Sequence, residues 1–140
     1  MDDYLQPSEL YLHVKLNDNT QGGIIGITVY CDGELIDEIR EYIDEVASEM
    51  ELAVIGLAFA LEYACDGDII YSLLEYCTKG FNEWLNNWKA RGWRKANRKP
   101  ITYREHWQEV DEWRSCKYLT VKRADKWGEE MEYLKQWLVE

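Results

Sequence analysis

The residues with the most distinctive chemistry are a stretch of basic and aromatic side chains, WLNNWKARGWRKANRKP, at positions 84–100. It contains no acidic residue, although the chain carries a formal charge of −11 at pH 7. Its six cations are Lys89, Arg91, Arg94, Lys95, Arg98 and Lys99, and its tryptophans are Trp84, Trp88 and Trp93. Lysine and arginine are the residues that neutralise phosphates when a protein binds a nucleic acid. By itself, however, the stretch is also explained by packing, in which the tryptophans join two helices and the cations are only solvated.

The rest of the chain is strongly acidic, since the charge outside the basic stretch is −17. This balance argues against nucleic-acid binding over the whole surface. It favours either simple solubility or an anionic surface for a basic partner protein. Seven acidic residues that could form such a surface, or only a solvated face, are Asp37, Glu38, Glu41, Asp44, Glu45, Glu49 and Glu51.

The composition predicts one compact domain over residues 1–140, because 46% of the residues are hydrophobic and 14% aromatic. No apolar run is long enough to span a membrane, and the start MDDYLQPSEL does not resemble a secretory signal. We therefore expect a cytoplasmic protein without a membrane partner. The spacing of the four cysteines favours buried thiols over disulfides or zinc ligands; they are Cys31, Cys65, Cys77 and Cys116.

The hydrophobic periodicity predicts the element order β-β-β-α-β-α-α-β-α. Alternating patterns indicate the first strands, with a tight turn at Asp32-Gly33. Spacings of three and four residues indicate the helices. The expected strands are 11–17, 23–30, 68–74 and 117–123, with 35–43 either a third strand or an early helix. The expected helices are 48–66, 75–89, 102–114 and 127–138. This order predicts a mixed sheet with helices on both faces.

Three motifs in this order resemble the bacterial type 1 ribonuclease H family. Residues 84–100 match the W-x-x-x-W-K-x-R-G-W-K…K-P handle of that family, and His106-Trp107-Gln108 match the L-W-Q that follows it. Met50-Glu51-Leu52 match the M-E-L that opens the family's first helix. The resemblance implies an α/β fold with a five-stranded mixed sheet. It also implies that the handle lies along an RNA/DNA hybrid.

Members of that family cleave the RNA strand of the hybrid with two Mg²⁺ ions held by four carboxylates. The resemblance implies remnants of this set at Asp18, Glu51 and Glu132, of which Asp18 and Glu51 could still bind one weak metal. Glu129 and Glu130 are alternatives to Glu132. Leu73 stands where the third carboxylate is expected, and Glu75 is two residues too late. An isobutyl group cannot ligate a cation, so the two-metal site is predicted to be incomplete.

The resemblance and these departures predict a catalytically inactive or crippled ribonuclease H homologue that acts by binding or regulation. It would require no cofactor, with Mg²⁺ or Mn²⁺ needed only for residual activity. The expected partner is a protein or a protein–nucleic-acid complex, with an RNA/DNA hybrid contacting the handle. A viral or mobile-element inhibitor or decoy of nucleic-acid machinery would fit this description. The alternatives are a residual metal-dependent endoribonuclease of RNA/DNA hybrids, and a hybrid-binding module without cleavage.

Overall fold

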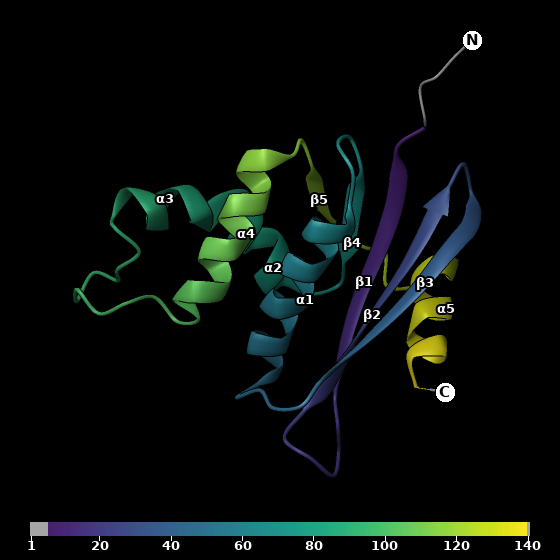
Figure 1. Cartoon of the computed structure of the whole chain (residues 1–140), viewed down its shortest axis with the longest axis horizontal. Helices are drawn as coiled ribbons and strands as arrows, with labels where there is room; N and C mark the ends of the chain where they lie inside the picture. The colour runs from purple at the N-terminus through teal and green to yellow at the C-terminus, as the bar shows by residue number, and fades with distance from the viewer. Residues whose placement is uncertain (1–5, 140) are drawn as a thin grey trace.

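A computed structural model describes residues 6–139 and contains a five-stranded sheet of order β3-β2-β1-β4-β5 (Figure 1). The strands are β1 (Ser8–Leu16), β2 (Gly23–Cys31), β3 (Glu34–Ile43), β4 (Ile69–Ser72) and β5 (Thr120–Arg123). The first three strands form an antiparallel meander, whereas β4 and β5 run parallel to β1. The predicted mixed sheet and the predicted element order are confirmed.

Residues 34–43, which the sequence left open between strand and helix, form the edge strand β3. The β2–β3 turn uses Asp32 at φ 55° and Gly33 at φ 82°, the left-handed geometry that tight hairpins require. The pairing register with β2 shifts at Val29/Tyr30, where Ile36 has no partner and forms a β-bulge. From Asp37 to Ile43 the register is unbroken.

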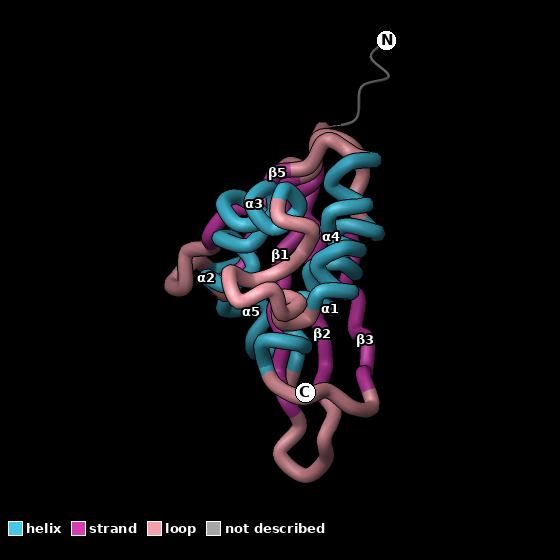
Figure 2. Tube along the Cα trace, turned by 90° about the vertical axis from the view of Figure 1, so that its left-hand side faces the viewer, coloured by secondary structure: helices cyan, strands magenta, loops and turns pink. Residues whose placement is uncertain are grey.

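Helices cover both faces of the sheet (Figures 1 and 2). One face carries α1 (Glu49–Tyr63), α2 (Glu75–Lys79) and α4 (Arg104–Cys116), and the other carries α5 (Glu129–Leu138). Helix α1 begins at Ser48, whose hydroxyl accepts the Glu51 N–H, an ordinary N-cap. None of the helices among residues 6–139 combines the length and the apolarity that crossing a membrane requires.

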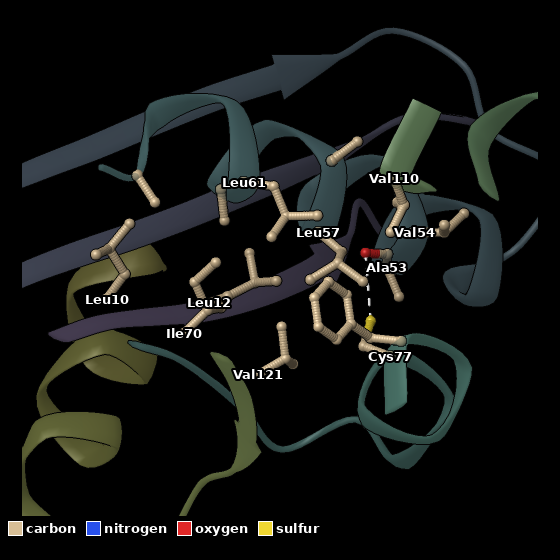
Figure 3. Packing of buried hydrophobic residues seen from close by; sticks show 14 of the residues in the cluster. Leu10, Leu12, Ala53, Val54, Leu57, Leu61, Ile70, Cys77, Val110 and Val121 are labelled. Carbon is tan, nitrogen blue, oxygen red and sulfur yellow. Dashed lines mark hydrogen bonds between the residues drawn. The ribbon is translucent and has the colours of Figure 1, made fainter. Parts of the chain in front are cut away.

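The main core lies between the sheet and α1, where Leu10, Leu12, Leu57, Leu61 and Ile70 are fully buried (Figure 3). Cys77 is buried there, and its Sγ lies 3.5 Å from the Ala53 carbonyl oxygen. All four cysteines are free thiols. Their predicted burial is correct only for Cys77, because Cys65 and Cys116 are exposed and Cys31 is half-buried.

The segment between β4 and α4 is a continuous helical run followed by a loop. It comprises α2, a π-helical turn η1 (Gly80–Trp84) and α3 (Leu85–Ala90), and residues 91–103 then return the chain to α4. Gly80 lets this run approach α4, since a Cβ there would lie 2.1 Å from the Trp107 ring. The run and its loop extend away from the sheet in Figure 1.

Candidate nucleic-acid interface and carboxylate positions

The name handle is used for residues 84–100. The part of the handle that follows α3 is a loop whose conformation is closed by main-chain hydrogen bonds. The Lys95 N–H donates to the Lys99 carbonyl at 2.7 Å, and the Ile101 N–H donates to the Trp93 carbonyl at 3.1 Å. Trp93 and Arg98 have φ values of 64° and 69°, a region that non-glycine residues occupy only when their surroundings enforce it. The loop therefore presents its side chains from a preformed backbone.

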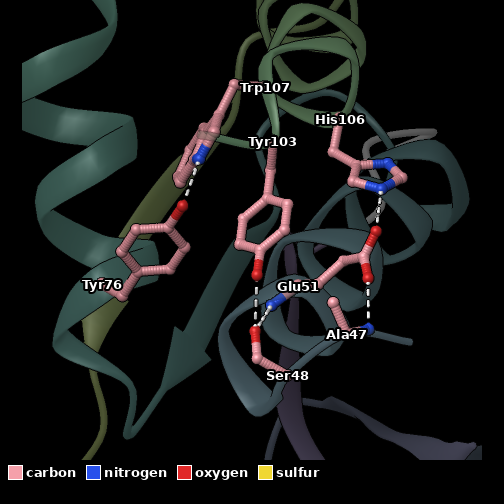
Figure 4. A network of polar contacts seen from close by, with 7 residues as sticks. All are labelled: Ala47, Ser48, Glu51, Tyr76, Tyr103, His106 and Trp107. Atoms are coloured by element: carbon pink, nitrogen blue, oxygen red, sulfur yellow. Dashed lines mark hydrogen bonds and ion pairs between the residues drawn. The ribbon is translucent and has the colours of Figure 1, made fainter. Parts of the chain in front are cut away.

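The handle tryptophans connect helices to one another. Trp88 lies 5.7 Å from Trp84 and 5.2 Å from Trp107, measured between ring centroids. The Trp107 Nε1–H donates to the Tyr76 hydroxyl at 2.8 Å (Figure 4). Trp84, Trp88 and Trp93 are half-buried, and Trp88 and Trp93 pack against the main core. This placement agrees with the packing interpretation of the tryptophans.

The six handle cations fall into two groups. The Lys89 ammonium lies 3.0 Å from a carboxylate oxygen of the buried Asp111, whose other oxygen lies 3.0 Å from Arg114. Lys89 is therefore partly neutralised by Asp111, although its own side chain is 55% exposed. The other five are exposed and have no carboxylate partner among residues 6–139; they are Arg91, Arg94, Lys95, Arg98 and Lys99. The Arg94 guanidinium also stabilises the loop conformation, because it donates a hydrogen bond to the Arg98 carbonyl at 2.9 Å.

Glu51 is held by protein groups on both carboxylate oxygens (Figure 4). One oxygen accepts the Ala47 N–H at 2.7 Å, and the other lies 3.1 Å from Nε2 of His106 on α4. The Ala47 hydrogen bond and the His106 contact lower the pKa of Glu51. Beside it, Ser48 Oγ and the Tyr103 hydroxyl are 2.7 Å apart. Glu51 thus connects the start of α1 to the start of α4.

Asp18, which the resemblance implies as a remnant of the carboxylate set, does not lie near the end of β4. It lies in the exposed β1–β2 turn, six residues beyond Leu12, which is the last β1 residue paired with β4. At about 3.3 Å per residue, this separation places Asp18 far along the sheet from the end of β4. The residues that follow the Leu12–Ser72 pair on the two strands are His13 and Leu73. The structure therefore does not bring Asp18 beside the end of β4, because β1 continues past the last residue that pairs with β4.

Leu73 lies in an apolar cluster under α5, with Ala124, Met131 and Leu134. His13 is on the same face of the sheet, and its Nδ1 is buried without a hydrogen-bond partner among residues 6–139. Burial and the charge of Lys135 lower the pKa of His13, so the imidazole is kept neutral. A hydrocarbon and a neutral imidazole therefore lie side by side where β4 ends next to β1.

The glutamates of α5 point in different directions. Glu132 is 55% exposed and lies 3.9 Å from the Lys135 ammonium. Glu130 is half-buried and lies near Tyr11 of β1. The pKa of Tyr11 is raised mainly by the burial of Tyr11 itself and next by the negative charge of Glu130. Of the three glutamates considered, Glu130 is thus the one near β1, whereas Glu132 faces solvent.

The side chains present do not fit a two-metal site of the kind that the resemblance implies. Within residues 6–139, no three carboxylate, histidine or cysteine side chains converge as metal ligands. Glu51 already engages Ala47 and His106, and Leu73 offers no donor atom. Mg²⁺ requires several oxygen ligands in fixed geometry, which these side chains do not supply.

Sequence reasoning missed three residues of this region. Asp111 anchors Lys89, His106 engages Glu51, and His13 lies beside Leu73. A polar residue within the apolar stripe of a predicted helix would have indicated Asp111. Nothing local in the sequence indicates the Glu51–His106 contact, which joins residues 55 positions apart.

Comparison with known proteins identifies the class. The RNase H family model matches residues 9–123, and the chain belongs to this family. It is 41% identical over 86 residues to the ribonuclease H of Francisella tularensis subsp. novicida, covering 61% of this chain and 52% of the relative. It is 44% identical over 66 residues to that of Cupriavidus metallidurans, covering 46% and 45% respectively. The chain thus spans about half the length of the curated relatives it matches.

Solved structures share the fold at low identity. The solution structure of the PFV RNase H domain aligns with a TM-score of 0.77 at 14% identity, covering 97% of this chain and 92% of that one. The structure of LC9-RNase H1, a type 1 RNase H with the type 2 active-site motif, gives 0.71 at 17% identity, with coverages of 99% and 73%. The predicted five-stranded α/β fold is confirmed.

Proposed function

We propose that this RNase H family member acts by binding and does not hydrolyse RNA/DNA hybrids. The observation that carries the proposal is the end of β4, where Leu73 packs into an apolar cluster beside a half-buried, neutral His13. Two metal ions that activate water and stabilise the leaving oxygen need anionic ligands at such a position. The loss of one ligand removes several kcal/mol of transition-state stabilisation, and about 1.4 kcal/mol is a factor of ten in rate.

The handle supplies the nucleic-acid contact in this proposal. Its five exposed cations are carried by a loop that main-chain hydrogen bonds close. One protein of similar fold, a foamy viral protease-reverse transcriptase, has been solved in complex with an RNA/DNA hybrid. Exposed cations on a loop of this kind would contact such a backbone through its phosphates, with an affinity that falls steeply with salt. A role as a viral or mobile-element inhibitor or decoy of nucleic-acid machinery, acting on a protein–nucleic-acid complex, belongs to the same proposal.

The test measures binding and cleavage on one labelled RNA/DNA hybrid. Arg91→Gln, Lys95→Gln and Lys99→Gln together should weaken binding and reduce the salt slope by up to about three. The matched control neutralises three exposed cations elsewhere, Lys122→Gln, Arg123→Gln and Lys126→Gln. Equal losses in both variants would show that only net charge matters.

The cleavage arm uses the same hybrid with Mg²⁺ and with Mn²⁺. We expect no turnover from the wild-type chain. Cleavage that is abolished by Glu51→Gln and retained by Asp18→Asn would overturn the non-hydrolytic proposal and favour the residual endoribonuclease. The Asp18 variant is the appropriate control because its carboxylate lies outside the β1–β4 pairing.

A further inference from the structure

The outer edge of β3 is an unpaired strand edge with a strong charge. β3 is the last strand of the sheet on its side, and no strand within residues 6–139 pairs with its outer edge. Its segment from Asp37 to Ile43 keeps a regular register with β2. A regular edge leaves backbone N–H and C=O groups available to another extended chain. The bulge at Ile36 limits this regular edge to about seven residues.

The charge along this edge selects what can pair with it. Residues 34–45 contain six carboxylates and a single cation, Arg40. Arg40 is already used inside the protein, where its guanidinium lies 4.2 Å above the Trp137 ring and donates to the Trp137 carbonyl. The edge therefore presents uncompensated negative charge. A second acidic copy of the same edge would be repelled, because like charges directly opposite one another destabilise a strand pair.

The carboxylates project from both faces of the strand. Asp37 and Glu41 pair with Val29 and Ile25 of the α1 face, whereas Glu38 pairs with Thr28 of the opposite face. The Tyr63 hydroxyl donates to Asp37. That hydrogen bond raises the pKa of Tyr63 to about 12. The Tyr133 hydroxyl is within hydrogen-bonding reach of Glu38. Two anions of this edge are thus fixed in position before any partner arrives.

Exposed apolar side chains lie at both ends of the edge. Ile36 is 57% exposed and Tyr42 is 65% exposed, although both belong to a strand. An added strand would bury part of each side chain, which contributes about 25 cal/mol per Å² of apolar surface. The unpaired backbone groups, the carboxylates and the exposed apolar side chains would therefore all be contacted by one added strand.

We propose that β3 binds an extended, lysine- or arginine-rich segment of a protein partner, which adds to the sheet as a sixth strand. The inference rests on the proposed binding role and names the chemistry of the partner. Main-chain hydrogen bonds give such an interaction its affinity, and alternate side chains give it specificity. The six carboxylates recruit a basic segment and reject an acidic one.

The probe is a seven-residue peptide that alternates lysine and threonine, titrated calorimetrically into the full chain. Two further peptides carry N-methyl groups on the odd or on the even residues, which removes alternate N–H donors and keeps the charge. Because only alternate N–H groups of an added strand face its neighbour, one N-methylated peptide should bind about tenfold more weakly or worse. The other should bind like the parent. Equal affinity of all three peptides would overturn strand addition.

A charge variant provides the second arm. Glu34→Gln, Glu41→Gln and Asp44→Gln together should weaken the parent peptide at least about tenfold. The matched control removes three exposed charges elsewhere through Glu62→Gln, Glu112→Gln and Glu129→Gln, and should bind normally. Equal weakening in both variants would contradict a site on β3. Concentration-dependent self-association that depends on Glu34, Glu41 and Asp44 would also overturn it, because the occupant would then be a second copy.

Hybrid binding is measured on the same β3 variant. Normal hybrid binding without peptide binding would reject only the β3 inference. Peptide binding without hybrid binding would reject the handle contact and leave the β3 site standing.

Discussion

Glu51 and His106 join the first turns of two helices, with 3.1 Å between carboxylate and imidazole. The same carboxylate accepts the Ala47 N–H just before α1. A carboxylate with protein partners on both oxygens is expected to stabilise the fold. That role gives a direct stability test.

Glu51→Gln should destabilise the chain by about 1–2 kcal/mol in urea unfolding at neutral pH. The pKa of Glu51 is below its ordinary value of 4.5 in the folded state, so its stabilisation is fully present above that value. It is lost as pH falls through the lower, folded-state pKa. The difference between wild type and variant should therefore shrink in acid. A pH-independent difference would mean that ionisation of Glu51 does not matter.

Lys117 should be among the more costly cations to remove. Its ammonium donates to the carbonyls of Leu61, Glu62 and Ala64 at 2.9, 2.6 and 2.7 Å, at the end of α1. A cation there satisfies carbonyls that the helix leaves free and opposes the negative end of its dipole. Lys117→Met should cost about 1–3 kcal/mol in chemical unfolding. Lys122→Met, at an exposed position, should cost little, and similar losses would contradict the capping role.

Introducing an acid at Leu73 should not create a metal site. Leu73→Asp places a carboxylate in an apolar cluster beside His13, so we expect a loss of about 2–4 kcal/mol without rescue by Mn²⁺. The double variant His13→Asp with Leu73→Asp places two carboxylates side by side on adjacent strands, and Mn²⁺ should raise its melting temperature. Thermal unfolding with and without Mn²⁺ decides this. Equal Mn²⁺ stabilisation of the wild-type chain would contradict the proposed loss of the site.

Asp111→Asn should release Lys89 for external contact. The substitution removes the anion that lies 3.0 Å from both Lys89 and Arg114. We expect a stability loss of about 1–2 kcal/mol, because both cations keep access to water. Hybrid affinity should rise, with a salt slope steeper by about one. Lys89→Gln in the same background should reverse that gain; a gain that persists would assign it to net charge alone.

Much of the fold could be predicted from the sequence because its signals are local. The period of α1, the Asp32-Gly33 turn and the motif across residues 84–100 each lie within one short segment. β3 stayed ambiguous because its dense charges hide the alternation of an edge strand.

The site was predicted less well because strand register is not a local property. Asp18 was assigned through the family resemblance, yet only the pairing of β1 with β4 shows that His13 is the residue beside Leu73. The partners of Glu51 and Lys89 also come from distant segments. Their side-chain contacts depend on how the helices pack, which residue spacing alone does not determine.

The position of α5 at the end of the element order has a consequence for biosynthesis. The meander of β1, β2 and β3 can form as soon as it leaves the ribosome, since its pairs are neighbours in sequence. Its second face stays uncovered until residues 129–138 emerge and α5 docks. During that interval the nascent chain exposes Ile24 and Tyr11 to chaperones, so translation pauses before residue 129 should increase chaperone dependence.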